Sequence, residues 1–330
     1  MTLERPSPEF LVLISDTVAS HGRERSGMVG LADLVEVDGG QSKTDKTEAL
    51  DVLRVQVEGV VSYLLEDLED EFIGENVGIA ETMSWLELTS YQTYTTDTTL
   101  SGHTLFAPKT VPANVKLPIL LWGQGGCSAD SLQDEPFLTQ LASHGVLVIA
   151  SGTPKGKGST TAAQMTAGID WVVKKAGTGK YANVDASRII AAGWSCGGVE
   201  AYAQSWDSRV QSIGIWSSGF LTNVSAPASI NKPVFYFMGG SSDIAYANGE
   251  RDYKALPAAV PKWKGNLPVG HGGTYTQANG GKFGVAGGYW VNWLLRGNAS
   301  ASSYFTGAGA RNDGWSVESA NLNKISVTPI

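Results

Sequence analysis

Histidine, cysteine and long apolar runs are all scarce in this chain of 330 residues. Its four histidines leave few candidates for a base near neutral pH, and two cysteines are compatible with either redox compartment. No apolar run reaches the roughly 18 residues that a membrane-spanning helix needs, so we expect no membrane span. Lysine and arginine form no cluster dense enough to indicate nucleic-acid binding.

Acidic charge is concentrated in the N-terminal part of the chain. Residues 1–85 hold 18 of the 32 acidic residues but only 6 of the 24 basic ones. We therefore expect an acidic extension over residues 1–85, partly disordered, with a helix near 44–72 where apolar residues recur at helical spacing. Its apolar stretch at 10–14 is too short for a signal peptide, so none is visible in this chain.

Residues 86–330 have the sequence pattern of a single domain of the α/β class, long enough to be a catalytic domain. Short apolar runs predict strands at 117–122, 145–150, 188–192, 210–216 and 233–238. Helices are expected at 131–143, 160–176 and 197–206, with a final long helix that includes 289–295. Strands that alternate with helices indicate a mostly parallel sheet with helices on both faces.

One motif in this domain carries chemistry. Gly193-Trp194-Ser195-Cys196-Gly197 matches G-x-S-x-G, and it joins an apolar strand to a helical stretch. A turn this tight strains the serine backbone and projects the hydroxyl above the sheet edge. We predict that Ser195 is a nucleophile, although a tight surface turn with an incidental serine is the plainer alternative.

A serine nucleophile needs a base, and His271 is the best candidate. It lies late in the chain in a glycine-rich loop, Pro268–Thr274. His21 falls in the acidic extension, His103 precedes the first well-defined strand, and His144 ends a helix at the wrong sheet edge. The chain order of nucleophile and base fits that of hydrolases with this turn.

The acid that orients the base should lie between them in the chain. Asp243 follows the strand at 233–238 by a few residues, at the carboxyl edge where such sheets place their sites. Glu250 and Asp252 are rivals further from the strand end. Two backbone N–H groups should bind the developing oxyanion: that of Cys196, after the nucleophile, and that of Gln124, with Gly125 as the alternative.

Residues from about 90 to 320 resemble the α/β-hydrolase superfamily, and within it the secreted microbial esterases of the dienelactone-hydrolase-like and cutinase-like groups. The resemblance rests on four segments: Trp122–Gly126, Gly193–Gly198, Gly239–Asp243 and Gly270–Tyr275. Trp122 departs from it, since many relatives have histidine before the oxyanion glycine. The resemblance implies an α/β-hydrolase fold, a serine esterase and secretion.

In that fold Cys127 and Cys196 belong to the same sheet edge. We predict a disulfide between them, with two buried thiols as the alternative. Only 13 residues separate Gly219 from Pro233, too few for a helical cap domain. The site should therefore be open, and we expect Trp194, Trp216 and Tyr246 to line it.

These features predict a carboxylic ester hydrolase with an acyl-serine intermediate and an open site suited to bulky or polymeric esters. We expect it to need neither a metal nor a cofactor. A serine peptidase of the same fold differs only in leaving group, and a non-catalytic binding protein on this scaffold is the third alternative.

Overall fold

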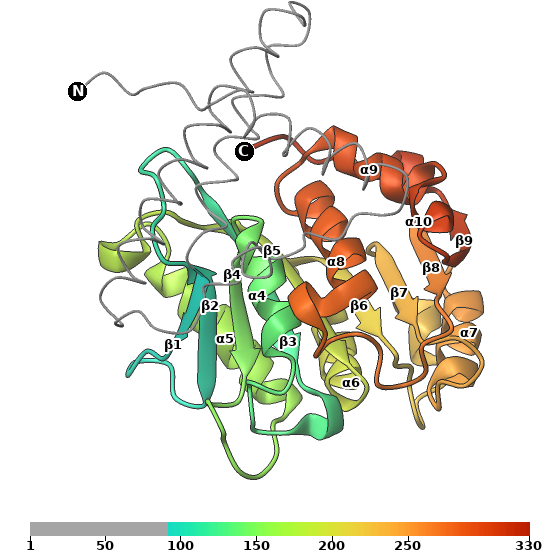
Figure 1. The fold of residues 1–330 in the computed structure, drawn as a ribbon, viewed down its shortest axis with the longest axis horizontal. Helices are drawn as coiled ribbons and strands as arrows, with labels where there is room; N and C mark the ends of the chain where they lie inside the picture. The colour runs from blue at the N-terminus through green and yellow to red at the C-terminus, as the bar shows by residue number, and fades with distance from the viewer. Residues whose placement is uncertain (1–91) are drawn as a thin grey trace, which may run out of the picture. The chain divides into compact units, whose positions relative to one another are not determined.

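Residues 92–330, which the computed structural model describes, form a layered α/β structure around one mixed sheet (Figure 1). They belong to a unit that spans Glu81–Ile330. The predicted acidic extension at 1–85 and its helix near 44–72 lie outside the described residues. None of the helices in the described part is long and apolar enough to cross a membrane.

The sheet has nine strands in the order β1-β2-β4-β3-β5-β6-β7-β8-β9. β3 to β8 are mutually parallel, while β2 and β9 run antiparallel to them. The strands are β1 (Gln92–Thr95), β2 (His103–Pro108), β3 (Leu117–Gly123), β4 (Leu147–Ser151), β5 (Val184–Trp194), β6 (Val210–Trp216), β7 (Val234–Met238), β8 (Lys262–Asn266) and β9 (Ser316–Ala320).

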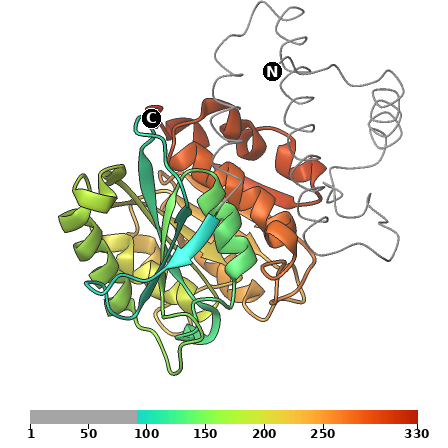
Figure 2. The same ribbon diagram turned by 60° about the vertical axis from the view of Figure 1, so that its left-hand side comes forward.

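Helices cover both faces of the sheet, as the continuous apolar strands predict. One face carries α4 (Glu135–Ser143), α8 (Gly281–Leu294), α9 (Ala299–Thr306) and α10 (Gly309–Asn312). The other carries α5 (Ala162–Lys175), α6 (Cys196–Ala203) and α7 (Tyr246–Ala255). Figure 2 shows α5 and α8 on opposite sides of the sheet. Along β3, Leu120 and Trp122 face the first core, whereas Ile119 and Leu121 face the second.

The expected α/β class and the five predicted strands are confirmed, but several elements differ. The helix expected at 131–143 begins at Glu135, and the last predicted helix begins at Gly281 and is followed by α9 and α10. His103 does not precede the first sheet strands, because it begins β2. Four strands were not predicted, because their apolar runs are short or absent: the edge strands β1 and β9, the antiparallel strand β2 and the polar strand β8.

The strand order changes direction beside the central strand β3. The chain runs from β3 to β4 on one side and then returns to β5 on the other, so β3 and β5 are neighbours and the loops that follow them start side by side. Gly123 and Gly193 are paired in register, so both loops leave the sheet at the same level. Between β6 and β7, all of residues 217–233 are described, and they contain only the 3₁₀ helix Ala226–Ser229. The expected absence of an inserted helical cap at this point is confirmed.

Candidate active site

Ser195 alone makes the turn from strand to helix. β5 ends at Trp194 and α6 begins at Cys196. The serine backbone has φ 53° and ψ −117°, a conformation that residues with a side chain rarely adopt. A Cβ at Gly197 would lie 2.1 Å from the carbonyl carbon and oxygen of Gly123, so only glycine fits there. This local geometry is the one that a nucleophile elbow requires.

The structure brings Ser195, His271 and Asp243 into one hydrogen-bonded line. His271 Nε2 lies 2.9 Å from Ser195 Oγ, and His271 Nδ1 lies 2.6 Å from Asp243 Oδ1. The three residues come from the loops after β5, β8 and β7, at the carboxyl ends of parallel strands. The segments predicted to converge therefore do so, although they are separated by 76 and 28 residues along the chain.

Backbone hydrogen bonds fix the Asp243 carboxyl group where it contacts the imidazole of His271. Its side chain is buried, Oδ2 accepts a hydrogen bond from Gly239 N–H at 3.0 Å, and Oδ1 accepts one from Ala245 N–H at 2.9 Å. An ionised carboxylate only accepts hydrogen bonds, so it requires His271 Nδ1 to be the protonated nitrogen of the neutral ring. Nε2 is then the acceptor, available for the Ser195 hydroxyl proton.

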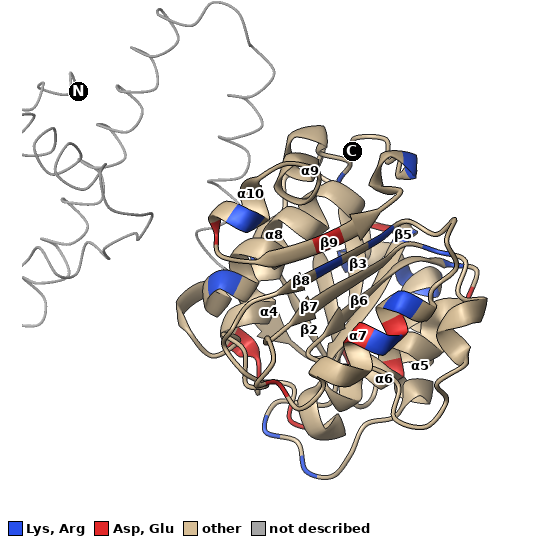
Figure 3. Cartoon of the chain, turned by 90° about the vertical axis from the view of Figure 1, so that its right-hand side faces the viewer, with Lys and Arg blue, Asp and Glu red and all other residues tan. Residues whose placement is uncertain are grey.

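The two rival carboxylates are engaged elsewhere. Glu250 on α7 pairs with Lys264 Nζ at 2.7 Å, and Lys264 also pairs with Glu318 at 2.9 Å. Figure 3 shows the charged segments of α7, β8 and β9 that carry these groups. Asp252 accepts hydrogen bonds from Phe220 N–H at 2.6 Å and from Arg251 Nε at 2.9 Å. Of the three candidate acids, Asp243 is the one that reaches His271.

A disulfide joins the loop after β3 to the elbow. Cys127 and Cys196 are bonded, with their Cα atoms 5.1 Å apart, so the prediction of a disulfide is confirmed over that of two thiols. Gly197 N–H donates to the Gln124 carbonyl at 3.0 Å and ties the same two segments together. Cys196 is the first residue of α6, so its N–H has no acceptor within the helix. The roles of Cys196 and Gln124 as oxyanion donors stay predictions.

Trp194 contributes to the site in a way that the sequence did not predict. Its Nε1–H donates to the carbonyl oxygen of His271 at 2.9 Å, and its ring lies 4.9 Å from that of Tyr275 between ring centroids. A Cβ at Gly125 would lie 2.3 Å from the Trp194 ring, so this ring also lies against the loop after β3. Trp194 is half-buried and links the histidine loop to the elbow.

The predicted substrate role of Trp216 is wrong. Its side chain is fully buried and stacks on Phe237 with ring centroids 3.8 Å apart, so a substrate cannot reach it. Trp216 ends β6, and its ring faces the apolar core under α8 rather than the sheet edge. Tyr246 begins α7, three residues after Asp243, and is half-buried; its role stays a prediction.

Two carboxyl groups are buried that the sequence did not identify as buried. Asp134 directly precedes α4 and looks like a helix cap, yet its side chain makes no capping hydrogen bond and instead accepts one from Trp122 Nε1 at 3.2 Å. Burial raises the pKa of Asp134 to about 7. Glu200 on α6 accepts a hydrogen bond from Thr160 Oγ1 at 2.9 Å, and burial raises its pKa. In the sequence both resemble ordinary solvated acids.

Comparison with known proteins assigns this chain to no family. No model of a known protein family matches it, and no curated protein matches it either. In residues 92–330, no three His, Cys, Asp or Glu side chains are grouped so that they could hold a metal ion. The function of this chain is therefore inferred from the geometry around Ser195.

Proposed function

We propose that this chain is a serine hydrolase of the α/β-hydrolase type that cleaves carboxylic esters. The observation that carries the proposal is the continuous line from Asp243 through His271 to Ser195, with both contacts at hydrogen-bond distance. The strained serine at a strand-to-helix turn and the chain order Ser, Asp, His support it. The mostly parallel nine-stranded sheet with helices on both faces is compatible with that fold.

In this mechanism His271 Nε2 takes the proton of Ser195 Oγ as the oxygen attacks the ester carbonyl carbon. The tetrahedral intermediate collapses when the protonated His271 gives that proton to the leaving alcohol, which breaks the carbon–oxygen bond and leaves an acyl-serine. A water molecule then attacks the acyl group while His271 takes its proton; the acyl–serine bond breaks, the acid leaves, and His271 returns the proton to Ser195 Oγ. Asp243 stays ionised and stabilises the imidazolium in both steps.

The oxyanion of each tetrahedral intermediate needs donors that are already in place. We assign them to the backbone N–H groups of Cys196 and Gln124. The disulfide and the hydrogen bond from Gly197 to the Gln124 carbonyl hold these segments together, so little reorganisation accompanies the reaction. The disulfide also favours an oxidising compartment, which agrees with a secreted enzyme.

A bulky or polymeric ester is the substrate class that we propose. The loops around the site carry apolar side chains that are exposed to solvent: Ile244, next to Asp243, is 81% exposed, and Leu221, after β6, is 72% exposed. Residues 217–233 contain only the short 3₁₀ helix Ala226–Ser229 and no α-helix that could enclose them. Such side chains favour contact with an apolar substrate that extends beyond Ser195.

Covalent labelling and hydrolysis together test this proposal. An organophosphonate probe should label the wild-type chain at Ser195, and a panel of p-nitrophenyl esters should be hydrolysed. Ser195→Ala should lose labelling and lower kcat by on the order of 10⁶, by analogy with triad deletions, while the fold is kept. Labelling at another residue, or ordinary activity in Ser195→Ala, would show that the assignment is wrong.

A further inference from the structure

Trp122 and Asp134 form a buried polar pair at the end of β3. Trp122 is the last residue but one of the strand, and Gln124, the proposed oxyanion donor, directly follows the strand. Both side chains of the pair are 0% exposed, and Trp122 Nε1 donates to Asp134 Oδ2 at 3.2 Å. The proposed mechanism assigns no role to either side chain, although Trp122 lies two residues before the donor.

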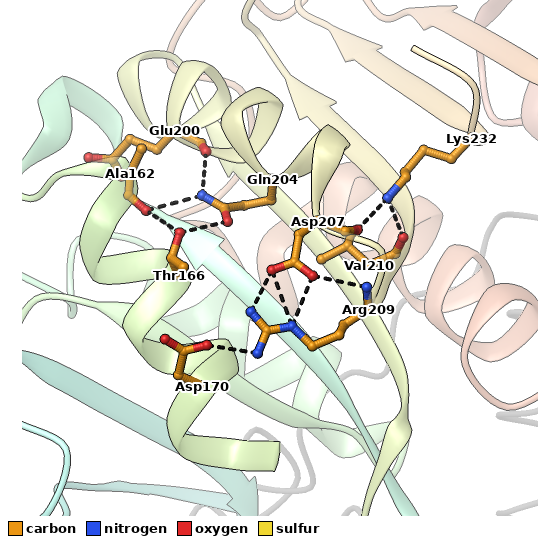
Figure 4. Close-up of polar contacts among 9 residues, drawn as sticks. All are labelled: Ala162, Thr166, Asp170, Glu200, Gln204, Asp207, Arg209, Val210 and Lys232. Atoms are coloured by element: carbon orange, nitrogen blue, oxygen red, sulfur yellow. Dashed lines mark hydrogen bonds and ion pairs between the residues drawn. The ribbon is translucent and has the colours of Figure 1, made fainter. Parts of the chain in front are cut away.

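No lysine or arginine in residues 92–330 pairs with the buried carboxyl group of Asp134. Its one side-chain partner there is the neutral indole, and Oδ1 makes no hydrogen bond. Asp207 shows the usual arrangement: it accepts hydrogen bonds from Arg209 Nε at 2.9 Å and from Arg209 Nη2 at 2.6 Å (Figure 4). Burying a carboxyl group beside a single neutral partner costs free energy. Stability therefore gives no reason for this contact, whereas a role in placing Trp122 gives one.

A second contact to the indole of Trp122 comes from α4. Asp134 directly precedes that helix, and Phe137, in its first turn, packs on Trp122 with ring centroids 5.0 Å apart. The backbone of Trp122 is paired in register with Ala150 on β4 and with Ala192 on β5. The ring contact and the hydrogen bond therefore tie the end of β3 to one end of α4.

The N–H group of Gln124 depends on the end of β3 more than on the rest of its loop. This N–H belongs to the peptide bond that joins Gly123 to Gln124. The Gln124 carbonyl belongs to the next peptide bond, which the hydrogen bond from Gly197 N–H fixes. Gly123 has no side chain that could hold the first peptide bond in place, so the nearest side chain on the strand is that of Trp122.

We propose that Asp134 is a positioning residue, which acts through Trp122 to hold the N–H of Gln124 where the oxyanion forms. The inference rests on the proposed esterase function and adds to it a residue outside the triad. An oxyanion donor works only within about 2.7–3.1 Å of the charge that it stabilises. A small shift at the end of β3 therefore weakens this donor while Ser195 and His271 keep their contact.

A pair of esters measures the oxyanion contact by itself. The two are p-nitrophenyl acetate and its thiono analogue, in which sulfur replaces the carbonyl oxygen that the donors contact. Sulfur is the weaker hydrogen-bond acceptor. The ratio of kcat/KM for the oxygen ester to kcat/KM for the sulfur ester therefore reports how well the donors are placed. Displacement of the base lowers both rates and leaves this ratio unchanged.

Variants of the pair should change this ratio. Trp122→Phe keeps a ring in the core and removes the indole donor; it should lower kcat/KM for the oxygen ester about tenfold and the ratio about fivefold, part of the roughly 10²–10³ that loss of a whole donor costs. Asp134→Leu should have the same effect, and the double variant should be no worse, because both changes remove one contact. Asp134→Asn keeps an acceptor for the indole and should stay within about threefold of wild type. Trp194→Phe, which loosens the loop of His271, should lower kcat/KM and keep the ratio.

The outcomes separate this inference from the function on which it rests. If the acetate ester is hydrolysed but a folded Trp122→Phe variant keeps the wild-type ratio, the positioning proposal fails and the esterase proposal stands. An Asp134→Asn variant that loses as much as Asp134→Leu also overturns it, because the hydrogen bond to the indole is then not what matters. If the wild-type chain hydrolyses no ester and Ser195 is not labelled, both proposals fail. Thermal melting identifies a variant that does not fold; if Asp134→Leu is one, Trp122→Phe provides the decisive ratio.

Discussion

The indole of Trp194 donates a hydrogen bond to the backbone carbonyl of His271 at 2.9 Å, so the residue before Ser195 holds the loop that carries the proposed base. This contact adds to the hydrogen bonds from Val269 N–H and Gly270 N–H to the Gly239 carbonyl, at 3.1 and 2.8 Å. The imidazole therefore reaches Ser195 from a loop that is fixed on two sides.

Trp194→Phe should lower kcat about three- to tenfold, because it removes one hydrogen bond worth about 1 kcal/mol and keeps the ring contact with Tyr275. Steady-state kinetics on a short ester provide the measurement. Trp171→Phe is the matched control, since Trp171 Nε1 donates at 2.9 Å to Thr99 on another part of the fold. Equal kcat in the two variants would show that the link to His271 has no role in positioning.

Asp243→Asn should lower kcat by on the order of 10⁴ with little change in fold. The amide can donate to His271 Nδ1, which favours the tautomer with the proton on Nε2 and removes the acceptor that Ser195 needs. Glu250→Gln changes a rival carboxylate on α7 and should stay within a few-fold of wild-type kcat. A larger loss from Glu250→Gln than from Asp243→Asn would reverse the assignment of the acid.

Removal of the disulfide should affect both stability and rate. The bond closes a loop between residues 69 apart, and Cys127→Ser with Cys196→Ser should lower the free energy of unfolding by about 2–4 kcal/mol. We also expect a lower kcat, because the segments that carry the proposed oxyanion donors are less firmly held. Urea denaturation and ester kinetics measure the two effects, and reductant should bring the wild-type chain toward the variant. Unchanged kcat in the folded double variant would separate the disulfide from catalysis.

Asp134 should make stability depend on pH. Its pKa is about 7 when folded, against about 3.9 in an unfolded chain, so the native state binds the extra proton between these values. The contribution of Asp134 to the free energy of unfolding is therefore greatest below about pH 4. It falls as the pH rises to about 7, by up to about 4 kcal/mol for this fully buried group.

Asp134→Asn removes the titrating group and keeps an acceptor for Trp122 Nε1. We compare the free energy of unfolding of the variant with that of wild type at each pH. The difference in favour of the variant should be larger at pH 8 than at pH 5. Urea denaturation of both proteins at the two pH values measures that difference. A stability difference that is the same at both pH values would mean that Asp134 does not titrate in this window.

Local patterns predicted the parts of this protein that depend on neighbouring residues. The apolar runs located β3 to β7, and the glycines around Ser195 located the turn, because a strand, a tight turn and a helix are decided within a few residues. The polar strand β8 could not be found in this way. Its Lys264 is 1% exposed and is stabilised by Glu250 and Glu318, which belong to two other elements, α7 and β9.

By itself, the sequence determined the alternation of strands and helices, the order of Ser195, Asp243 and His271, and the cysteines available for a disulfide. Tertiary structure decided which side chains meet. The register of Gly123 with Gly193 brings the two loops together, and core packing hides Trp216 while Trp206 stays at the surface. Burial and contact between distant segments depend on how the sheet and helices pack, and no short stretch of sequence encodes that packing.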